Sequence, residues 1–289
     1  MKRLLLAAIA AILVGGPCFV ADAQERVPPV FEPVDVLVYT RWQYVKNQKT
    51  GEVAKSGTAP WAKAYHHDST EQGAAAMKRC FTANGLKCLV TDDPAFFVSD
   101  AMKTLRCVML CNCNHELFAT DAQREAFYAF VENGGGLLVT HSASACERGS
   151  KRFRDFLGGS FERHYRKHQP VPFRHADRSH PAIACLPNGY MWADDEIYLN
   201  HPDEDHVRPL LVLDWGDVLE ESRKTDKWGC PKSGGHVLEW CKTFGKGRIY
   251  YTALGHNAKD WDKKEWQLHL LEAARWTMGE GEECARDGK

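Results

Sequence analysis

An alternation of short apolar runs and segments of helical pattern constrains the fold of this chain most strongly. The apolar runs cover residues 34–39, 86–91, 106–112 and 136–141, and each has the composition of a buried strand. Helices are predicted at 69–84 and from Thr120 to the glycines at 134–136. This order predicts an α/β fold, in which a mainly parallel sheet carries helices on both faces.

The second half of the chain has a less regular pattern. Strand-like pieces occur at 164–176 and 210–215, and the segment 235–252 predicts a hairpin around a glycine turn. A last amphipathic helix is expected over 261–278, and the polar stretch 41–60 is expected to be a long loop. Because no linker separates the halves, we expect one domain at 34–279 and a tail at 280–289.

The first 23 residues have the pattern of a secretory signal peptide. A basic start precedes an apolar run at 4–14, whose 11 residues are fewer than the roughly 20 that span a bilayer. Ala21-Asp22-Ala23 then fits the small-x-small cleavage rule. We therefore expect cleavage after Ala23 and a periplasmic or secreted protein without a transmembrane segment. An uncleaved anchor is the alternative.

Export changes the interpretation of the cysteines, because an oxidising compartment permits disulfides. The chain has 11 cysteines, of which ten remain after cleavage. Proximity in the sequence makes Cys80 with Cys88, and Cys230 with Cys241, the candidate pairs, although connectivity does not follow from sequence alone.

The charge balance excludes one class of partner. Lys and Arg number 37 and Asp and Glu number 38, which gives a formal net charge of −1. A chain without an excess of basic residues is not suited to binding the negatively charged phosphate backbone of nucleic acids, so nucleic acid is not expected as a partner. The 13 histidines instead favour metal or acid–base chemistry.

Three histidines stand where the predicted strands end or a helix begins, which is where open α/β sheets bind ligands. His67 opens the first helix, His141 ends the strand at 136–141, and His256 follows the strand at 248–252. Each of these histidines has an alternative role as a turn or surface residue. If the strand at 248–252 joins the sheet, His141 and His256 lie on the same rim.

An acidic stretch at 194–198 supplies the candidate carboxylates. In an extended chain Glu196 and Tyr198 share one face, while Asp195 takes the other. A carboxylate beside histidines binds a divalent metal or transfers a proton. The alternative is a solvated acidic loop.

Ser142 and Trp240 are two further candidates with competing structural explanations. Ser142 follows His141 at a strand end, but the G-x-S-x-G pattern of a nucleophile elbow is absent. Trp240 lies on a predicted strand, where a tryptophan belongs to the core more often than to a sugar-stacking surface.

Six motifs, taken in their order, resemble the ThuA-like (trehalose-utilisation) family, whose fold is like that of class I glutamine amidotransferases. The resemblance extends from about Asp35 to Gly279. The motifs are YHHDST at 65–70, TDDPAFF at 91–97, FVENGGGLLVTHSA at 130–143, SHPAIACLP at 179–187, DDEIY at 194–198 and GKGRIYYTALGHN at 245–257.

The resemblance implies a pocket and a field of metabolism. It indicates His67, His141, Glu196 and His256 as catalytic residues, with Asp195 and Tyr198 beside them as substrate-binding residues. It implies metabolism of trehalose-type disaccharides and their keto-sugar derivatives. In the amidotransferases a nucleophilic cysteine occupies the turn between a strand and the following helix. Here the corresponding turn is His141-Ser142, and Cys146 lies too far along the chain to replace the cysteine. A cysteine-dependent glutaminase is therefore not expected.

These observations lead to one hypothesis and two alternatives. The protein is expected to be an exported enzyme acting on a sugar, disaccharide or keto-glycoside by isomerisation, hydrolysis or lyase chemistry. His141, Glu196 and His256 are the candidate ligands of a divalent transition metal such as Zn²⁺, which such donors suit better than Ca²⁺. The alternatives are a carbohydrate-binding module that stacks sugars on Trp192, Trp240 or Trp261, and a subunit of an exported complex. The oligomeric state is left open.

Overall fold

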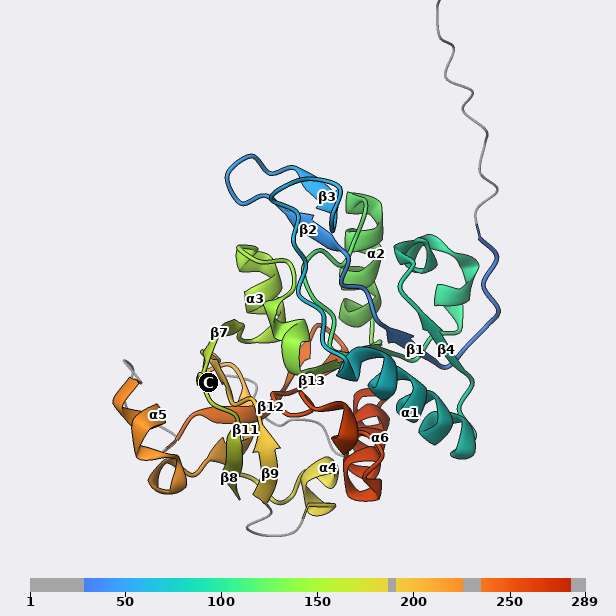
Figure 1. The fold of residues 1–289 in the computed structure, drawn as a ribbon. Coiled ribbons are helices and arrows are strands. Elements are labelled where there is room, and N and C mark those ends of the chain that lie inside the picture. The colour runs from blue at the N-terminus through green and yellow to red at the C-terminus, as the bar shows by residue number, and fades with distance from the viewer. Residues whose placement is uncertain (1–28, 187–190, 226–234, 282–289) are drawn as a thin grey trace, which may run out of the picture.

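One sheet of nine strands organises the molecule in the computed structural model, which describes residues 29–186, 191–225 and 235–281. The strand order is β4-β1-β5-β6-β13-β12-β11-β8-β9. The first five strands run parallel, and from β13 onward each neighbour is antiparallel (Figure 1). In sheet order the strands are Cys88–Thr91, Val36–Tyr39, Cys107–Leu110, Gly136–Thr140, Gly247–Thr252, Val237–Phe244, Arg208–Leu213, Gln169–His175 and Met191–Asp195.

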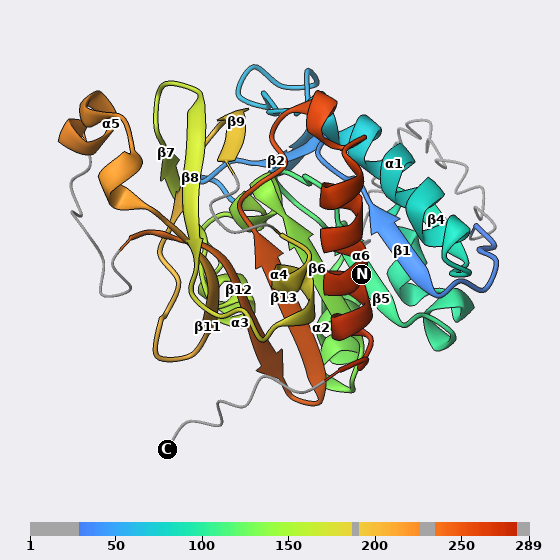
Figure 2. The same ribbon diagram turned by 90° about the horizontal axis from the view of Figure 1, so that it is seen from below.

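Helices cover both faces of the parallel half of the sheet. α1 and α6 lie together on one face, and α2 and α3 lie on the other (Figures 1 and 2). The α-helices are α1 Ser69–Ala83, α2 Asp121–Glu132, α3 Lys151–Leu157, α4 Pro181–Ala184, α5 Glu220–Thr225 and α6 Lys264–Thr277, and the 3₁₀ turns are Pro94–Val98, Asp100–Lys103, His141–Ala145, Trp215–Asp217 and Ala258–Asp260.

The central parallel strands are buried along their whole length, as expected for strands with helices on both sides. Close backbone approach supports this layering: an added Cβ at Gly247 would lie 2.0 Å from the Val131 carbonyl oxygen of α2. α2 begins with a capping box between Thr120 and Gln123, at the predicted N-cap. The predicted α/β fold is therefore confirmed, and the hairpin predicted at 235–252 corresponds to β12 and β13.

Two small sheets stand apart from the main one. β7 (Phe161–His164) pairs with β10 (Tyr198–Asn200), and β2 (Tyr44–Lys46) pairs with β3 (Val53–Lys55). The second pair corrects the expectation of a long loop at 41–60. The side chain of Asn47 accepts hydrogen bonds from the next backbone N–H groups and Gly51 has φ +78°, so these residues close a hairpin.

The cysteine predictions have different outcomes. Cys80 and Cys88 are both free thiols, so the pairing predicted from their proximity is wrong. They belong to different elements, because Cys80 lies on α1 and Cys88 begins β4. Cys241 is disulfide-bonded, and Cys230, its predicted partner, lies outside the described residues.

Two further expectations concern segments that the structure leaves largely undescribed. The predicted signal peptide, residues 1–23, lies outside the described residues, as does most of the predicted tail at 280–289. Among the described helices, none combines the length and apolar composition needed to cross a bilayer.

Candidate functional site

His141 lies where β6 ends and the 3₁₀ turn His141–Ala145 begins. Its φ of +43° is in the left-handed region, which a residue with a side chain rarely adopts. The Nδ1–H donates to the Ala253 carbonyl oxygen at 2.8 Å, because a carbonyl only accepts hydrogen bonds. The Nε2 lone pair is thereby directed to the other side of the ring, toward Glu196 and His256.

A buried network around Asn112 fixes the neighbouring strand ends. Asn112 follows β5 with φ +45°, and its Nδ2 donates to Ser69 Oγ at 2.8 Å and to the Gly255 carbonyl at 2.9 Å. Thr140 Oγ1, at the end of β6, donates to Asn112 Oδ1 at 2.7 Å. These bonds join the start of α1, the ends of β5 and β6, and the loop after β13. They place His67, His141 and His256 at one rim of the sheet.

Four predicted site residues meet at this rim. One ligand atom from each of His67, His141, Glu196 and His256 lies within 4.8 Å of the others. His141 Nε2 is 3.2 Å from His256 Nδ1, and Glu196 Oε2 is 3.5 and 3.3 Å from these two atoms. The centroids of the three imidazoles are 5.0–5.2 Å apart with their planes steeply inclined.

The electrostatics keep this cluster in a form that binds cations. Burial opposes the charged form of Glu196, but the neighbouring His141 and His256 outweigh this effect and hold the pKa of the carboxyl well below its ordinary value. Burial, together with the charges of its two histidine neighbours, lowers the pKa of His67 to about 3. Burial also lowers the pKa of His141. His67 and His141 are therefore neutral imidazoles at neutral pH, as metal ligands must be.

The pKa of His256 is shifted in the opposite direction to the pKa values of the other two imidazoles. Burial disfavours its charged form, but the hydrogen bond and charge of Glu196 prevail and raise the pKa of His256. The side chains of Glu196 and His256 are 12% and 21% exposed, so the cluster is accessible from their side. A cation bound there would displace any proton held between them.

The residues predicted to bind substrate have different positions. Tyr198 forms a wall of the cluster, with its ring 3.9 Å from that of His141, centroid to centroid. Asp195 is fully buried and accepts from the backbone N–H groups of Glu196 and Gly255, and burial raises its pKa to about 7. Its position is that of a support behind Glu196.

Trp240 does not reach the cluster. It is fully buried, its Nε1–H donates to the Leu157 carbonyl, and its ring packs on Tyr251. The suggestion that Trp240 binds substrate is therefore not supported, because neither face of the ring is open to a ligand.

Two histidines that sequence reasoning missed also belong to the site. His164 Nδ1, at the end of β7, is 3.0 Å from Glu196 Oε1, and the ring of His168 packs edge-on against His256 at 4.7 Å. The pairing of β7 with β10 brings His164 to Glu196. The signal available in the sequence was the repetition of histidine at 164 and 168, inside the strand-like piece predicted at 164–176.

The neighbouring Ser142 and the nearby thiols lack the arrangement of a nucleophile. Ser142 Oγ is buried and has no hydrogen-bond partner among the described residues, so no base activates it. Burial raises the pKa of Cys146 well above its ordinary value, and the same holds for Cys111. These positions give no support to cysteine-dependent chemistry.

Comparison with known proteins agrees with this fold. The model of the ThuA family, described as trehalose utilisation, matches residues 60–277. A ThuA-like protein from Bacteroides uniformis has 22% identity and a TM-score of 0.60, over 86% of this chain and 94% of its own. One from Parabacteroides merdae has 16% identity and a TM-score of 0.59, over 89% and 94%. No curated protein matches the chain.

Proposed function

Because this chain belongs to the ThuA family, whose description supports a carbohydrate-related role, we propose that it is a carbohydrate-active enzyme with a divalent transition-metal site at His67, His141, Glu196 and His256. The observation that carries the proposal is the convergence of three imidazoles and one carboxylate from four separate parts of the chain. Nitrogen donors with one carboxylate suit Zn²⁺ and related ions, and disfavour Ca²⁺ and Mg²⁺.

Hydrogen bonds around the cluster support this ligand set. Metal-bound histidines usually donate their second N–H to a carbonyl or carboxylate, as His141 does to Ala253. Asn114 Nδ2 lies 3.1 Å from His67 Nδ1 and orients that ring, and a metal on His67 Nε2 would require the amide oxygen of Asn114 to face Nδ1–H instead. His164 Nδ1 lies 3.0 Å from Glu196 Oε1 and orients that carboxylate.

The chemistry that fits best is activation of a sugar carbonyl. A bound metal would polarise the carbonyl of a keto-sugar and acidify the adjacent C–H. His164 and His168 lie beside the cluster and are placed to take that proton. The outcome is isomerisation of the sugar, or elimination of the group attached to the carbon β to the carbonyl, next to the carbon that loses the proton.

Direct hydrolysis of an unoxidised glycoside is less well supported. It ordinarily needs two carboxyl groups facing the scissile bond from opposite sides. Here Glu196 is the carboxylate that faces the cluster, and Asp195 is buried behind it with both oxygens bonded to backbone N–H groups. We therefore favour a keto-glycoside over its parent glycoside as substrate.

The two alternatives have less support. A non-catalytic binding module was expected to stack sugars on Trp192, Trp240 or Trp261, and all three are buried. The other alternative is a subunit of an exported complex whose pocket has lost its function. Such a subunit would have no need for an ionised Glu196 beside neutral imidazoles.

Turnover of a keto-disaccharide and of its unoxidised parent tests the proposal. We expect the metal-loaded protein to consume the keto-disaccharide, and Glu196→Gln and His256→Ala to abolish this activity. His66→Ala is the matched control, because His66 pairs with Glu71 and its ring lies outside the cluster. Equal turnover by wild type and Glu196→Gln would contradict the assignment.

Export remains part of the proposal. The pattern of residues 1–23 supports it, and the disulfide bond of Cys241 fits an oxidising compartment. N-terminal sequencing of protein from the periplasmic fraction is expected to begin at Gln24. A mature chain beginning at Met1 in the cytoplasm would exclude it.

A further inference from the structure

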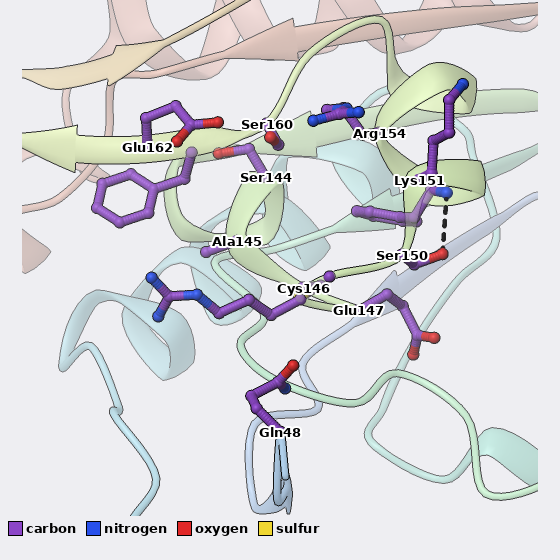
Figure 3. A pocket seen from close by; sticks show the side chains of 14 residues that line it. Gln48, Ser144, Ala145, Cys146, Glu147, Ser150, Lys151, Arg154, Ser160 and Glu162 are labelled. Atoms are coloured by element: carbon purple, nitrogen blue, oxygen red, sulfur yellow. Dashed lines mark hydrogen bonds between the residues drawn. The ribbon is translucent and has the colours of Figure 1, made fainter. Parts of the chain in front are cut away.

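A cavity of about 420 Å³ lies next to the histidine cluster and is not used by the chemistry proposed above. Figure 3 shows the loop through Ser144 and Glu147 between two walls, with Arg154 and Glu162 on one side and Gln48 on the other. The walls therefore come from α3, β7 and the β2–β3 hairpin. The volume is in the range of small-molecule sites, about 300–1,000 Å³.

Two lining residues connect the cavity to the cluster. Ser144 Oγ donates to the His141 carbonyl oxygen at 3.1 Å, three residues along the same 3₁₀ turn. Phe161 packs on Tyr198 with centroids 4.3 Å apart, and Tyr198 packs on His141. Phe161 and Tyr198 thus lie between a ligand in the cavity and His141.

The charged side chains of the lining have both signs, and Arg148 is the one placed to hold an anion beside the exposed carboxylate of Glu162. Glu147 is neutralised by Arg124 from outside the cavity at 3.0 Å. Lys151 is paired with Asp155, also outside. Arg148 lines the cavity and makes no ion pair or hydrogen bond among the described residues, so its guanidinium is available to a ligand.

The remaining lining is suited to a sugar. Glu162 is exposed and supplies an acceptor for hydroxyl groups, while Ser150 and Ser160 supply hydroxyls of their own. Phe161, which is partly exposed, contributes apolar surface for the C–H face of a ring. Arg148 and Glu162 together allow one ligand to present both an anionic group and neutral hydroxyls.

We propose that this cavity is a subsite for the anionic group of a carbohydrate, a carboxylate or a phosphate, held by Arg148. The inference rests on the proposed function only for the carbohydrate class of the ligand. It predicts that the enzyme prefers substrates carrying an acidic sugar next to the reacting unit.

Calorimetric titration with D-glucuronate, D-glucose 6-phosphate and D-glucose tests the subsite without requiring turnover. We expect at least one of the two anions to bind about tenfold more tightly than glucose, as one charge-assisted pair would give. Glucuronate identifies a carboxylate ligand and glucose 6-phosphate a phosphate ligand. Equal affinity for all three sugars would overturn the proposal.

Two variants locate the effect. Arg148→Gln is expected to remove the preference for the anion, and Arg152→Gln to keep it, because Arg152 pairs with Glu125 and lies outside the lining. Anion preference that survives Arg148→Gln would overturn the assignment. The preference for the anion is also expected to persist in His256→Ala, which should lose the metal and turnover. A variant that keeps the anion preference without metal or turnover separates this inference from the proposed function.

Discussion

The imidazoles of the cluster are held in different ways, and these differences decide which of them can move when a ligand binds or a neighbour is substituted. His141 is fully buried and anchored to the Ala253 carbonyl, in a strained backbone conformation. His256 is partly exposed and is held by hydrogen bonds to His141 and Glu196. We therefore regard His141 as the rigid part of the site and His256 as the adaptable part.

Removing His164 is expected to weaken the metal site without removing a ligand. Its Nδ1 is close to two acceptors, Glu196 Oε1 at 3.0 Å and the Tyr165 carbonyl at 2.9 Å, so it carries the proton and orients the carboxylate. His164→Ala should lower metal affinity by roughly 10–100-fold, as for other residues that support ligands. Competition with a fluorescent chelator measures it, with His206→Ala as a remote control. An unchanged affinity would argue against this role.

His180 predicts a loss of stability in acid. It is buried, and burial with nearby Arg208 lowers its pKa from 6.5 to about 3. Between these values the unfolded chain takes up a proton that the folded chain does not, so stability is complete above about pH 6.5 and falls as the pH drops. His180→Asn keeps an acceptor for the Ala182 N–H at this helix start.

Urea unfolding at several pH values checks this prediction. Between pH 6 and 4 the wild-type unfolding free energy should fall more steeply than that of His180→Asn, by up to about 1.4 kcal/mol per pH unit. Parallel curves for the two proteins would show that His180 titrates normally in the folded state.

The order of the elements explains which parts of the site could be predicted. In a parallel sheet the strand ends share one rim, so His141 at the end of β6 and His256 after β13 could be placed together from sequence. Glu196 was a candidate from its acidic stretch, but only the resemblance to a family grouped it with the three histidines, because it lies between two strands of different sheets. His164 reaches the site through the pairing of β7 with β10, a long-range contact that the repeated histidines at 164 and 168 do not reveal.

The contact of β13 with α2 gives a prediction about packing. A Cβ at Gly247 would lie 2.0 Å from the Val131 carbonyl oxygen and 2.6 Å from that of Gly135, and neither backbone atom can move freely. Gly247→Ala should therefore destabilise the fold by about 1–3 kcal/mol. Gly216→Ala is the control, with its nearest neighbour 3.7 Å away. Equal thermal stability of both variants would show that the helix can shift without cost.

The whole molecule depends on one continuous sheet, whose strand ends support the histidine cluster. Its parallel half supplies the rim with His141, and its antiparallel half ends at β9, directly before Glu196. The α/β architecture followed from the alternation of strand and helix in the first half of the chain. The antiparallel extension was only partly predicted, because β8 pairs with β11 although β9 and β10 lie between them in the sequence.

Metal analysis of protein purified without chelators tests the central claim most directly. We expect about one equivalent of a transition metal per chain, with Zn²⁺ favoured, and its loss in His141→Ala and Glu196→Gln but not in His66→Ala. Wild-type protein that neither carries a metal nor binds added Zn²⁺, or variants that retain it as well as wild type, would contradict the account.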